Sequence, residues 1–278
     1  MERADIVRNY QVATLTIAGS DSSGGAGIQA DLKTFAAIGT YGMSVLTAIT
    51  AQNTQGVALV EDVSATMVGR QLQAVLDDIP PQAVKIGMVS SESIITVIEA
   101  ALGQYEIPYV VVDPVMVSKS GCALLADEAK EALISRLLPK AFLVTPNIPE
   151  AEEITGMKIT CVEEMKAAGQ RIRELGPRYV LMKGGHLTGD ATDVLIGEQM
   201  VELYHHERLH SANTHGTGCT LSSAITSYLA LGHRVEEAVE RGKKYITNAI
   251  LHSFPIGVGV GPVHHFYQFE GAGAHGNS

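Results

Sequence analysis

The chain has 278 residues, and 46% of them are hydrophobic, which is enough to bury the core of one large domain and excludes an intrinsically disordered protein. Its formal net charge is −10 and the sequence shows no basic stripe, so we expect no nucleic-acid partner.

Short runs of β-branched residues alternate with helical patterns along the chain. Consecutive apolar residues are typical of strands covered on both faces, and apolar residues three or four apart are typical of helices with one buried side. In chain order, the patterns predict a strand over 12–17, a helix from 28, a strand over 44–49, a helix over 68–79, strands over 83–87 and 109–112, a helix over 133–138, a strand over 141–145, a helix over 162–175, strands over 178–182, 192–196 and 200–209, and helices over 217–231 and 235–252. This alternation predicts an α/β fold with a mostly parallel sheet, and the hairpin around 197–199 predicts an antiparallel edge.

The pattern runs from residue 12 to residue 269 without a linker or an internal repeat, which we interpret as a single domain. Residues 1–11 are interpreted as an N-terminal extension, and residues 270–278 are predicted to be a disordered tail. Three long segments contain no charged residue, but their polar residues, prolines and glycines predict buried protein segments rather than membrane spans. Three widely spaced cysteines, Cys122, Cys161 and Cys219, and the lack of an apolar leader favour a reducing, cytoplasmic setting.

A first glycine cluster lies in residues 19–27, between a predicted strand and a predicted helix. Residues 25–30 match the G-x-G-x-x-A dinucleotide fingerprint, yet no acidic residue follows about 20 positions later to bind a ribose. We therefore disfavour a Rossmann oxidoreductase and interpret the cluster as a hinge or substrate loop, with Asp31 in the helix facing a ligand. The plainer interpretation is a glycine turn that lets two backbone segments approach each other.

A second cluster, Asn-Thr-His-Gly-Thr-Gly-Cys-Thr at 213–220, stands directly before an apolar helix. Free N–H groups at a helix N-terminus attract anions and stabilise the charge that develops on a transferred phosphoryl group. Cys219 falls in the first helical turn, where a thiolate is favoured. The alternative is an ordinary helix start beside a buried cysteine.

Three charged residues follow predicted strands at their carboxyl ends, where α/β proteins bind ligands. Lys183 is a candidate to neutralise a phosphate, the alternative being a solvated strand-end lysine. Glu150 is a candidate to hold Mg²⁺ directly or through water, the alternative being the first-turn acid of a helix that starts with proline. Asp113 has the same ambiguity. The histidine pairs 206/210 and 264/265 lack a cysteine or acid at metal-ligand spacing, so no transition-metal site is predicted.

Taken together, these motifs resemble the hydroxymethylpyrimidine/phosphomethylpyrimidine kinases of thiamine biosynthesis, which belong to the ribokinase-like superfamily. The resemblance is carried by residues 16–34, 51–54, 85–88, 113–116, 145–147 and 182–186, by the cluster at 213–220, and by Gly-Pro-Val-His-His at 261–265. It implies a three-layer α/β/α sandwich with a central, mostly parallel sheet and an antiparallel edge.

The resemblance also implies an activity. The family transfers the γ-phosphoryl group of ATP, with Mg²⁺, to 4-amino-5-hydroxymethyl-2-methylpyrimidine and then to the resulting monophosphate. The resemblance implies that Cys219 is the base and that Gly216 and Gly218 form the anion hole. It implies that the pyrimidine is bound by Gln52, Gly19 and Met88, and that its hydroxyl group is bound by Asp31. The implied ATP contacts are Lys183, Thr214, Thr217 and Asn147, and the implied Mg²⁺ ligands, directly or through water, are Glu150 and Asp113. A homodimer that acts on a small molecule is the family expectation.

Two alternatives stay open. A pyridoxal or pyridoxine kinase of the same superfamily, or an enzyme with both activities, fits the Gly-Thr-Gly-Cys form of the motif at 216–219. A catalytically silent nucleotide sensor would keep Lys183 and the anion hole, but the joint presence of Asp31, Gln52, Glu150 and Cys219 argues against it. Sugar kinases of the superfamily carry an aspartate base where this chain has Cys219, and a thiol of near-neutral pKa is expected to accept a proton at working pH.

Overall fold

The structure is a computed structural model that describes residues 12–116, 125–185, 191–206, 208–209 and 211–269. The predicted N-terminal extension, the predicted tail and Cys122 lie outside these described residues. Within them, no helix is long and apolar enough to cross a membrane.

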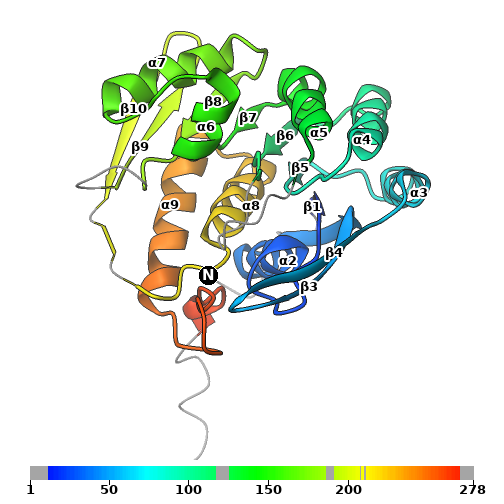
Figure 1. The fold of residues 1–278 in the computed structure, drawn as a ribbon, viewed down its shortest axis with the longest axis horizontal. Helices are drawn as coiled ribbons and strands as arrows, with labels where there is room; N and C mark the ends of the chain where they lie inside the picture. Colours follow the sequence, from blue (N-terminus) through cyan, green and yellow to red (C-terminus); the bar gives the residue numbers. More distant parts are fainter. Residues whose placement is uncertain (1–11, 117–124, 186–190, 207, 210, 270–278) are drawn as a thin grey trace, which may run out of the picture.

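An eight-stranded sheet forms the centre of the fold, in the order β10-β9-β8-β7-β6-β5-β1-β2 (Figure 1). The parallel strands are β1 (Ala13–Ala18), β2 (Tyr41–Leu46), β5 (Ala83–Ile86), β6 (Tyr109–Val112), β7 (Leu143–Val144) and β8 (Tyr179–Met182). At one edge, β9 (Ala191–Ile196) runs antiparallel to β8, and β10 (Val201–His206) pairs antiparallel with β9. The predicted mostly parallel sheet with a hairpin edge is therefore confirmed.

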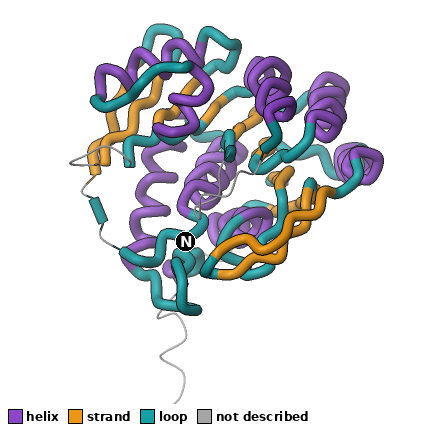
Figure 2. Tube along the Cα trace, in the orientation of Figure 1, coloured by secondary structure: helices purple, strands orange, loops and turns teal. Residues whose placement is uncertain are grey.

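Helices cover both faces of this sheet and make three layers, as Figure 2 shows. One face carries α2 (Gly27–Ile38), α8 (Thr217–Ala230) and α9 (Val235–Leu251). The other carries α3 (Ala65–Leu76), α4 (Glu92–Gln104), α5 (Asp127–Ala132), α6 (Ile148–Thr155) and α7 (Val162–Arg173). The predicted helix over 133–138 is a π-helical turn, Leu133–Leu137, followed by the 3₁₀ turn Leu138–Lys140, and a second 3₁₀ turn spans Tyr267–Phe269.

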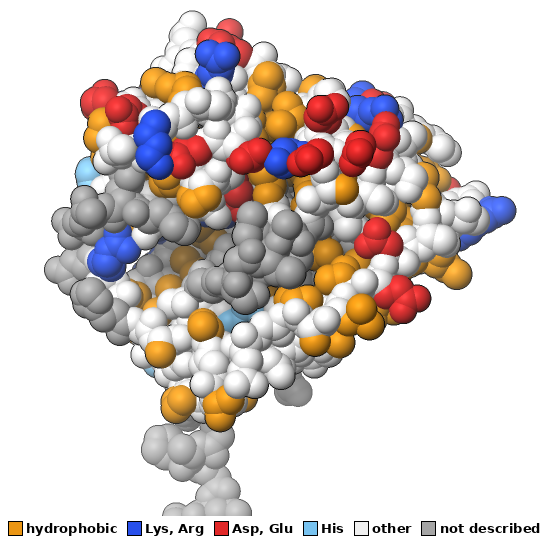
Figure 3. Space-filling model, in the orientation of Figure 1, with side chains coloured by type: hydrophobic (Ala, Val, Ile, Leu, Met, Phe, Trp, Pro, Cys, Tyr) orange, Lys and Arg blue, Asp and Glu red, His pale blue; other side chains and the backbone are white. Residues whose placement is uncertain are grey.

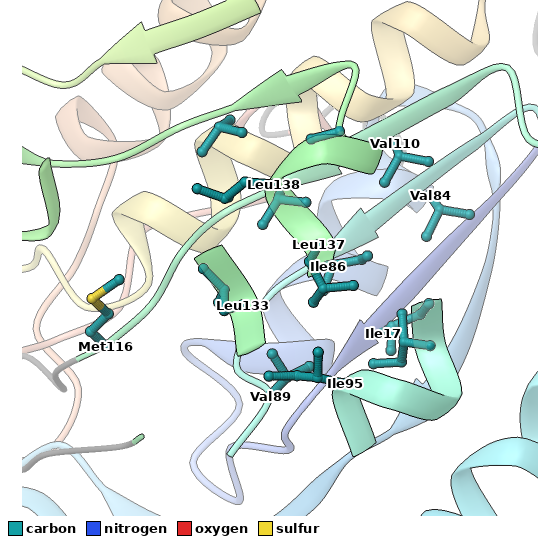
Figure 4. Close-up of a cluster of buried hydrophobic side chains, with 14 of the residues drawn as sticks. Ile17, Val84, Ile86, Val89, Ile95, Val110, Met116, Leu133, Leu137 and Leu138 are labelled. Carbon is teal, nitrogen blue, oxygen red and sulfur yellow. The ribbon is translucent and has the colours of Figure 1, made fainter. Parts of the chain in front are cut away.

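The two faces of the sheet differ in chemistry. On the α3–α7 face, Val84, Ile86 and Val110 join an apolar core with side chains of the covering helices (Figure 4). On the opposite face, apolar strand residues pack on α8 and α9 beneath β6 to β9, whereas β1 and β5 present buried polar side chains. These are Thr14, Thr16 and Lys85, and they meet polar side chains of α2 and α8, namely Asp31, Ser223 and Ser227, in part through Thr40. This buried polar layer lies under β1 and β5.

The predicted strand over 44–49 is wrong as one element. Strand β2 ends at Leu46, and after Thr47 the chain turns into β3 (Ala48–Asn53), which pairs antiparallel with β4 (Gly56–Asp62) in a separate two-stranded sheet. The backbone of Thr47 marks the junction, because its N–H donates to Ala18 O of the main sheet and its C=O accepts from Val63 N. Side chains on the outer side of the small sheet are exposed, 55% for Ile49 and 64% for Leu59. The view in Figure 3 shows hydrophobic side chains in this region and charged ones gathered over α4 to α7.

Candidate active site

The carboxyl ends of the parallel strands meet at one edge of the sheet, and the N-terminus of α8 faces them. Asp113 follows β6 and Lys183 follows β8. A Cβ atom placed on Gly218, in the first turn of α8, would lie 3.6 Å from both Asp113 Oδ2 and Lys183 Nζ. Residues from three distant parts of the chain thus converge, at the place where open α/β sheets bind ligands.

Asp113 is the centre of this convergence. Its Oδ1 lies 2.8 Å from Lys183 Nζ and accepts a hydrogen bond from Thr145 Oγ1 at 2.9 Å, and its Oδ2 accepts from Ser222 Oγ of α8 at 3.3 Å. Burial opposes ionisation, but the charges of Lys183 and Lys85 outweigh it and hold the pKa of Asp113 below its usual value. Burial likewise opposes the charge of Lys183, yet Asp113 and Glu150 raise its pKa. Lys183 is therefore a charged side chain fixed by an ion pair, and not a solvated lysine at the end of a strand.

The interpretation of Glu150 as the first-turn acid of a helix that starts with proline is confirmed. Helix α6 begins with a capping box, in which the Asn147 side chain accepts from Glu150 N at 2.9 Å and the Glu150 carboxylate accepts from Asn147 N at 2.8 Å. Glu150 is nevertheless buried, and its Oε2 lies 4.0 Å from Lys183 Nζ. Burial raises its pKa to about 7, with Lys183 opposing the shift and Asp113 adding to it. A further cation at the site would favour the ionised form of this carboxyl group and lower its pKa.

The two glycine clusters pack against each other, which confirms the interpretation of close backbone approach. Gly216 caps α8 with a φ of 76°, and a Cβ atom on it would lie 1.8 Å from Gly25 O. Gly27 has a φ of 56°, and a Cβ atom there would lie 2.4 Å from Gly19 O. Neither position accepts a side chain without a backbone shift. Thr217 N, at the same helix start, donates to Thr214 O at 3.4 Å.

Two residues of this contact carry no role in the sequence interpretation. Asp21 accepts hydrogen bonds from Ser23 and from the N–H groups of Gly25 and Ala26, so it shapes the first cluster. His215 Nε2 lies 2.7 Å from Asp21 Oδ2 and so joins this cluster to the second. Burial opposes the charge of Asp21, but hydrogen bonds from His215 and Ser23 hold its pKa well below the usual range. The signals available in the sequence were an acid within the first glycine cluster and a histidine beside a glycine in the second.

Gln52 is brought to the same place by β3. Its Nε2 lies 3.4 Å from His215 Nε2, and its backbone N–H donates to Ser22 Oγ at 2.9 Å. A surface groove of about 510 Å³ runs beside it along β3 and β4. Gly19 and Met88 lie next to the start of the same strand, because a Cβ atom on Gly19 would be 3.4 Å from Met88 Sδ and 3.6 Å from Ala48 O.

Asp31 lies elsewhere than the sequence interpretation places it. Its side chain is fully buried in an ion pair with Lys85, whose Nζ lies 2.9 Å from Asp31 Oδ2. Thr16 Oγ1 donates to Oδ2 at 2.6 Å and Ser223 Oγ donates to Oδ1 at 2.7 Å. With no exposed surface and both oxygens engaged, the carboxylate does not face a ligand, so the expected hydroxyl contact is replaced by an internal ion pair.

Cys219 is in the expected first turn of α8, but its expected near-neutral pKa is wrong. Burial raises the pKa of the thiol to about 11, with Lys85 opposing the shift and the charges of Asp31 and Asp113 adding to it. The helix N-terminus favours a thiolate, yet in this position desolvation outweighs that effect. Among the described residues, no group of three His, Cys, Asp or Glu side chains is placed to hold a metal ion.

Comparison with known proteins places these features in a family. Residues 21–264 match the family described as phosphomethylpyrimidine kinase. A hydroxymethylpyrimidine/phosphomethylpyrimidine kinase of Rhizobium meliloti is 52% identical, over 92% of this chain and 97% of that protein. The thiamine biosynthesis bifunctional protein ThiED of Geobacter sulfurreducens is also 52% identical over 93% of this chain, which spans only about half (53%) of that protein's length.

Solved structures agree with the relatives. The phosphomethylpyrimidine kinase of Clostridium difficile 630 is 62% identical, with a TM-score of 0.78 over 86% of this chain and 99% of that one. An ADP complex of Bacillus subtilis pyridoxal kinase is 40% identical, with a TM-score of 0.86 over 92% of this chain and 98% of that one.

Proposed function

Because this chain belongs to the phosphomethylpyrimidine kinase family, and is therefore a kinase, we propose that it phosphorylates 4-amino-5-hydroxymethyl-2-methylpyrimidine with ATP. In a second step it phosphorylates the monophosphate to the pyrophosphate, for thiamine biosynthesis. The observation that carries the proposal is the convergence of Lys183, Asp113 and the first turn of α8 on one point at the carboxyl edge of the sheet. That arrangement supplies what phosphoryl transfer needs, namely fixed positive charge in a largely buried place.

The phosphate end of the site is built from backbone and one lysine. Helix α8 begins at Thr217, and the Gly218 N–H lies in its first turn, where the helix dipole favours an anion. Gly216 and Gly218 lack side chains, so a phosphate can approach that backbone closely. Lys183 adds a full positive charge, and Asp113 keeps it in position through the 2.8 Å ion pair. Asn147 and Thr214 flank this region and complete the proposed ATP contacts. A net charge of −10 is no obstacle, because recognition is local.

Cys219 is the proposed acceptor of the hydroxyl proton. The substrate oxygen forms a bond to the γ-phosphorus, the bond between that phosphorus and the bridging oxygen of ADP breaks, and the hydroxyl proton moves to the sulfur. With a pKa of about 11 the thiol is protonated at neutral pH, so its proton must first leave to solvent, and the charge of Lys85 stabilises the thiolate that results. In a loose transition state this thiolate takes the hydroxyl proton late, when the substrate oxygen has become acidic, and Cys219 ends the step as a neutral thiol.

The pyrimidine end is proposed to lie between Gln52 and the floor formed by Gly19 and Met88. An amide can donate to a ring nitrogen and accept from an exocyclic amine, which matches an aminopyrimidine. His215 Nε2 lies 2.7 Å from Asp21 Oδ2 and 3.4 Å from Gln52 Nε2, so the histidine lies between the carboxylate of the first glycine cluster and the Gln52 amide. Since Asp31 is fully buried and its oxygens are engaged by Thr16, Lys85 and Ser223, we propose that it positions β1, β5 and α8 and does not touch substrate.

The residues present fit Mg²⁺. Glu150 is a buried carboxyl group with a raised pKa beside Lys183, and Asp113 lies in the same cluster. Mg²⁺ is usually held by one or two carboxylates together with substrate phosphates, so the lack of a complete protein cage among the described residues is consistent with it. The oxygens of Asp113 already accept from Lys183, Thr145 and Ser222, which makes Glu150 the better ligand. When bound, the ion shields phosphate charge.

The test is to count ADP per acceptor molecule, with ATP and Mg²⁺ in excess. The proposal expects about two ADP per hydroxymethylpyrimidine, one for each transfer. One ADP per pyrimidine would show that the second transfer does not occur. No turnover despite ATP binding would favour the catalytically silent nucleotide sensor. The same preparation in size-exclusion chromatography with light scattering tests the homodimer that the resemblance implies, and cell fractionation tests the proposed cytoplasmic location.

Pyridoxal phosphorylation is the second candidate activity. The structural match to the Bacillus subtilis pyridoxal kinase, with a TM-score of 0.86, favours it specifically. Pyridoxal also carries a hydroxymethyl arm on a six-membered nitrogen ring, so it can offer the same acceptor atom. Pyridoxal as the acceptor in the ADP assay decides between one activity and two, and competition with the pyrimidine shows whether both use one site.

A further inference from the structure

A buried ion pair between β9 and α9 has no part in the chemistry described above. Asp193 lies in β9 and Lys243 lies in α9, and both side chains are buried. Lys243 Nζ is 2.7 Å from Asp193 Oδ2, and among the described residues this ion pair is the contact that this oxygen makes. The pair is surrounded by the apolar contacts between the sheet and α9. Two charges in such a place are costly unless they hold something in position.

The second oxygen of Asp193 shows what is held. Asp193 Oδ1 accepts a hydrogen bond from Gly184 N at 2.9 Å, and Gly184 directly follows Lys183. Gly184 also lies against β9 so closely that a Cβ atom on it would be 1.8 Å from Thr192 O. On the other side, Lys183 N donates to Pro146 O at 2.8 Å. The two residues at the end of β8 are thus fastened to both neighbouring segments.

We propose that Asp193, oriented by Lys243, is a positioning residue that fixes the Lys183–Gly184 strand end for nucleotide binding. The inference rests on the phosphate-binding role proposed for Lys183. A hydrogen bond to a carboxylate is stronger than one to a neutral acceptor, and Lys243 prevents the carboxylate from turning away from Gly184. Because this backbone anchor is fixed, the Lys183 side chain points toward Asp113 and the start of α8.

Two double variants separate this role from general stability. Asp193→Asn with Lys243→Met removes both charges and keeps an acceptor for Gly184 N–H. Asp193→Leu with Lys243→Met also removes both charges, but it leaves that N–H without an acceptor. The probe is AMP-PCP with Mg²⁺, titrated by calorimetry, with hydroxymethylpyrimidine binding titrated in parallel. The surface pair Lys130–Glu153, 2.6 Å apart, provides the control variant Glu153→Gln.

The Asn double variant is expected to bind AMP-PCP within about threefold of wild type, and the Leu double variant about tenfold more weakly. Pyrimidine affinity and the control variant stay unchanged. Equal AMP-PCP affinity in all three proteins overturns the proposal, and so does a tenfold loss in the Asn variant. If the Leu variant does not fold, Asp193→Ala with Lys243→Met replaces it in the comparison, since it also removes both charges and the acceptor. Because AMP-PCP binding does not depend on the acceptor, a failure of the proposed pyrimidine activity is seen separately in the ADP assay.

Discussion

The Asp31 carboxylate lies 2.9 Å from the Lys85 ammonium, and neither side chain has any exposed surface. This pair joins three elements that end at the site, since Asp31 is in α2, Lys85 is in β5, and Ser223 of α8 donates to the same carboxylate. The charge on Lys85 is also felt by Cys219 and Asp113. A residue that sequence alone places against substrate thus holds the framework of the site together.

Asp31→Ala is expected to lower the free energy of unfolding by about 3–5 kcal/mol, because it leaves the Lys85 charge buried without its partner. Urea unfolding monitored by circular dichroism measures the change. Asp31→Asn combined with Lys85→Met should recover most of the loss. The matched control is Glu92→Ala in the surface pair Arg136–Glu92, also 2.9 Å apart, which should cost about 1 kcal/mol or less. Equal losses at the two pairs contradict the assignment.

Cys219 is expected to react slowly with iodoacetamide at pH 7 because its thiol is protonated. With a pKa of about 11, its alkylation rate should rise about tenfold per pH unit and show no plateau below pH 10. The rate is followed by mass spectrometry in a variant whose other two cysteines are serine. A plateau between pH 7 and 9 would restore the near-neutral thiol. In the kinetic assay, Cys219→Ala should lower kcat and leave the KM for ATP unchanged, and full kcat would remove the base role.

Glu150 makes stability depend on pH in the absence of Mg²⁺. Burial raises its folded pKa to about 7 from the ordinary 4.5, so the folded state binds its proton more tightly than the unfolded state does. Its contribution is therefore complete below pH 4.5 and is lost as the pH rises through 7. Glu150→Gln imitates the protonated form. Its Tm in Mg²⁺-free buffer should equal that of wild type at the acid end and exceed it at pH 8; a difference that does not vary with pH contradicts the sign.

Gly216→Ala tests the contact between the glycine clusters. The added methyl group meets Gly25 O at 1.8 Å, so the backbone must move, and kcat should fall at least about tenfold as the helix start shifts. Gly232→Ala is the control, since Gly232 has a φ of 90° but open space around it. It should cost about 1–2 kcal/mol of stability from strain alone and leave kcat intact. Two variants with the same kcat would show that the close approach has no role in catalysis.

The sheet and the strand-end positions of the candidate site residues could be predicted from the sequence, but the side-chain partners of the buried residues could not. Strand-end positions for Asp113 and Lys183 follow from local patterns and from the rule that parallel strands share an edge. The partners of Asp31 depend on contacts across the fold, which local patterns do not show. A signal was present in Lys85 itself, because a charge inside the apolar strand Ala83–Ile86 requires a buried counter-charge.

Two other differences have physical causes. The run over 44–49 contains good strand formers throughout, and the division at Thr47 is decided by what each half pairs with, which is a tertiary effect. The sequence pattern correctly predicts that Cys219 lies in the first turn of a helix. The rule that a helix start favours a thiolate fails for its pKa, because burial and the nearby carboxylates Asp31 and Asp113 raise that pKa.

The unequal faces of the central sheet have a consequence for how this chain tolerates change. Against α3 to α7 the core is hydrocarbon, so exchanges that conserve volume should be nearly neutral there. Under β1 and β5 the buried hydroxyl groups pair with one another or donate to the Asp31 carboxylate, and the same kind of exchange leaves a donor or acceptor unpaired. A complete single-substitution library selected for function should therefore divide along the plane of the sheet, permissive on one side and intolerant under β1 and β5 on the other.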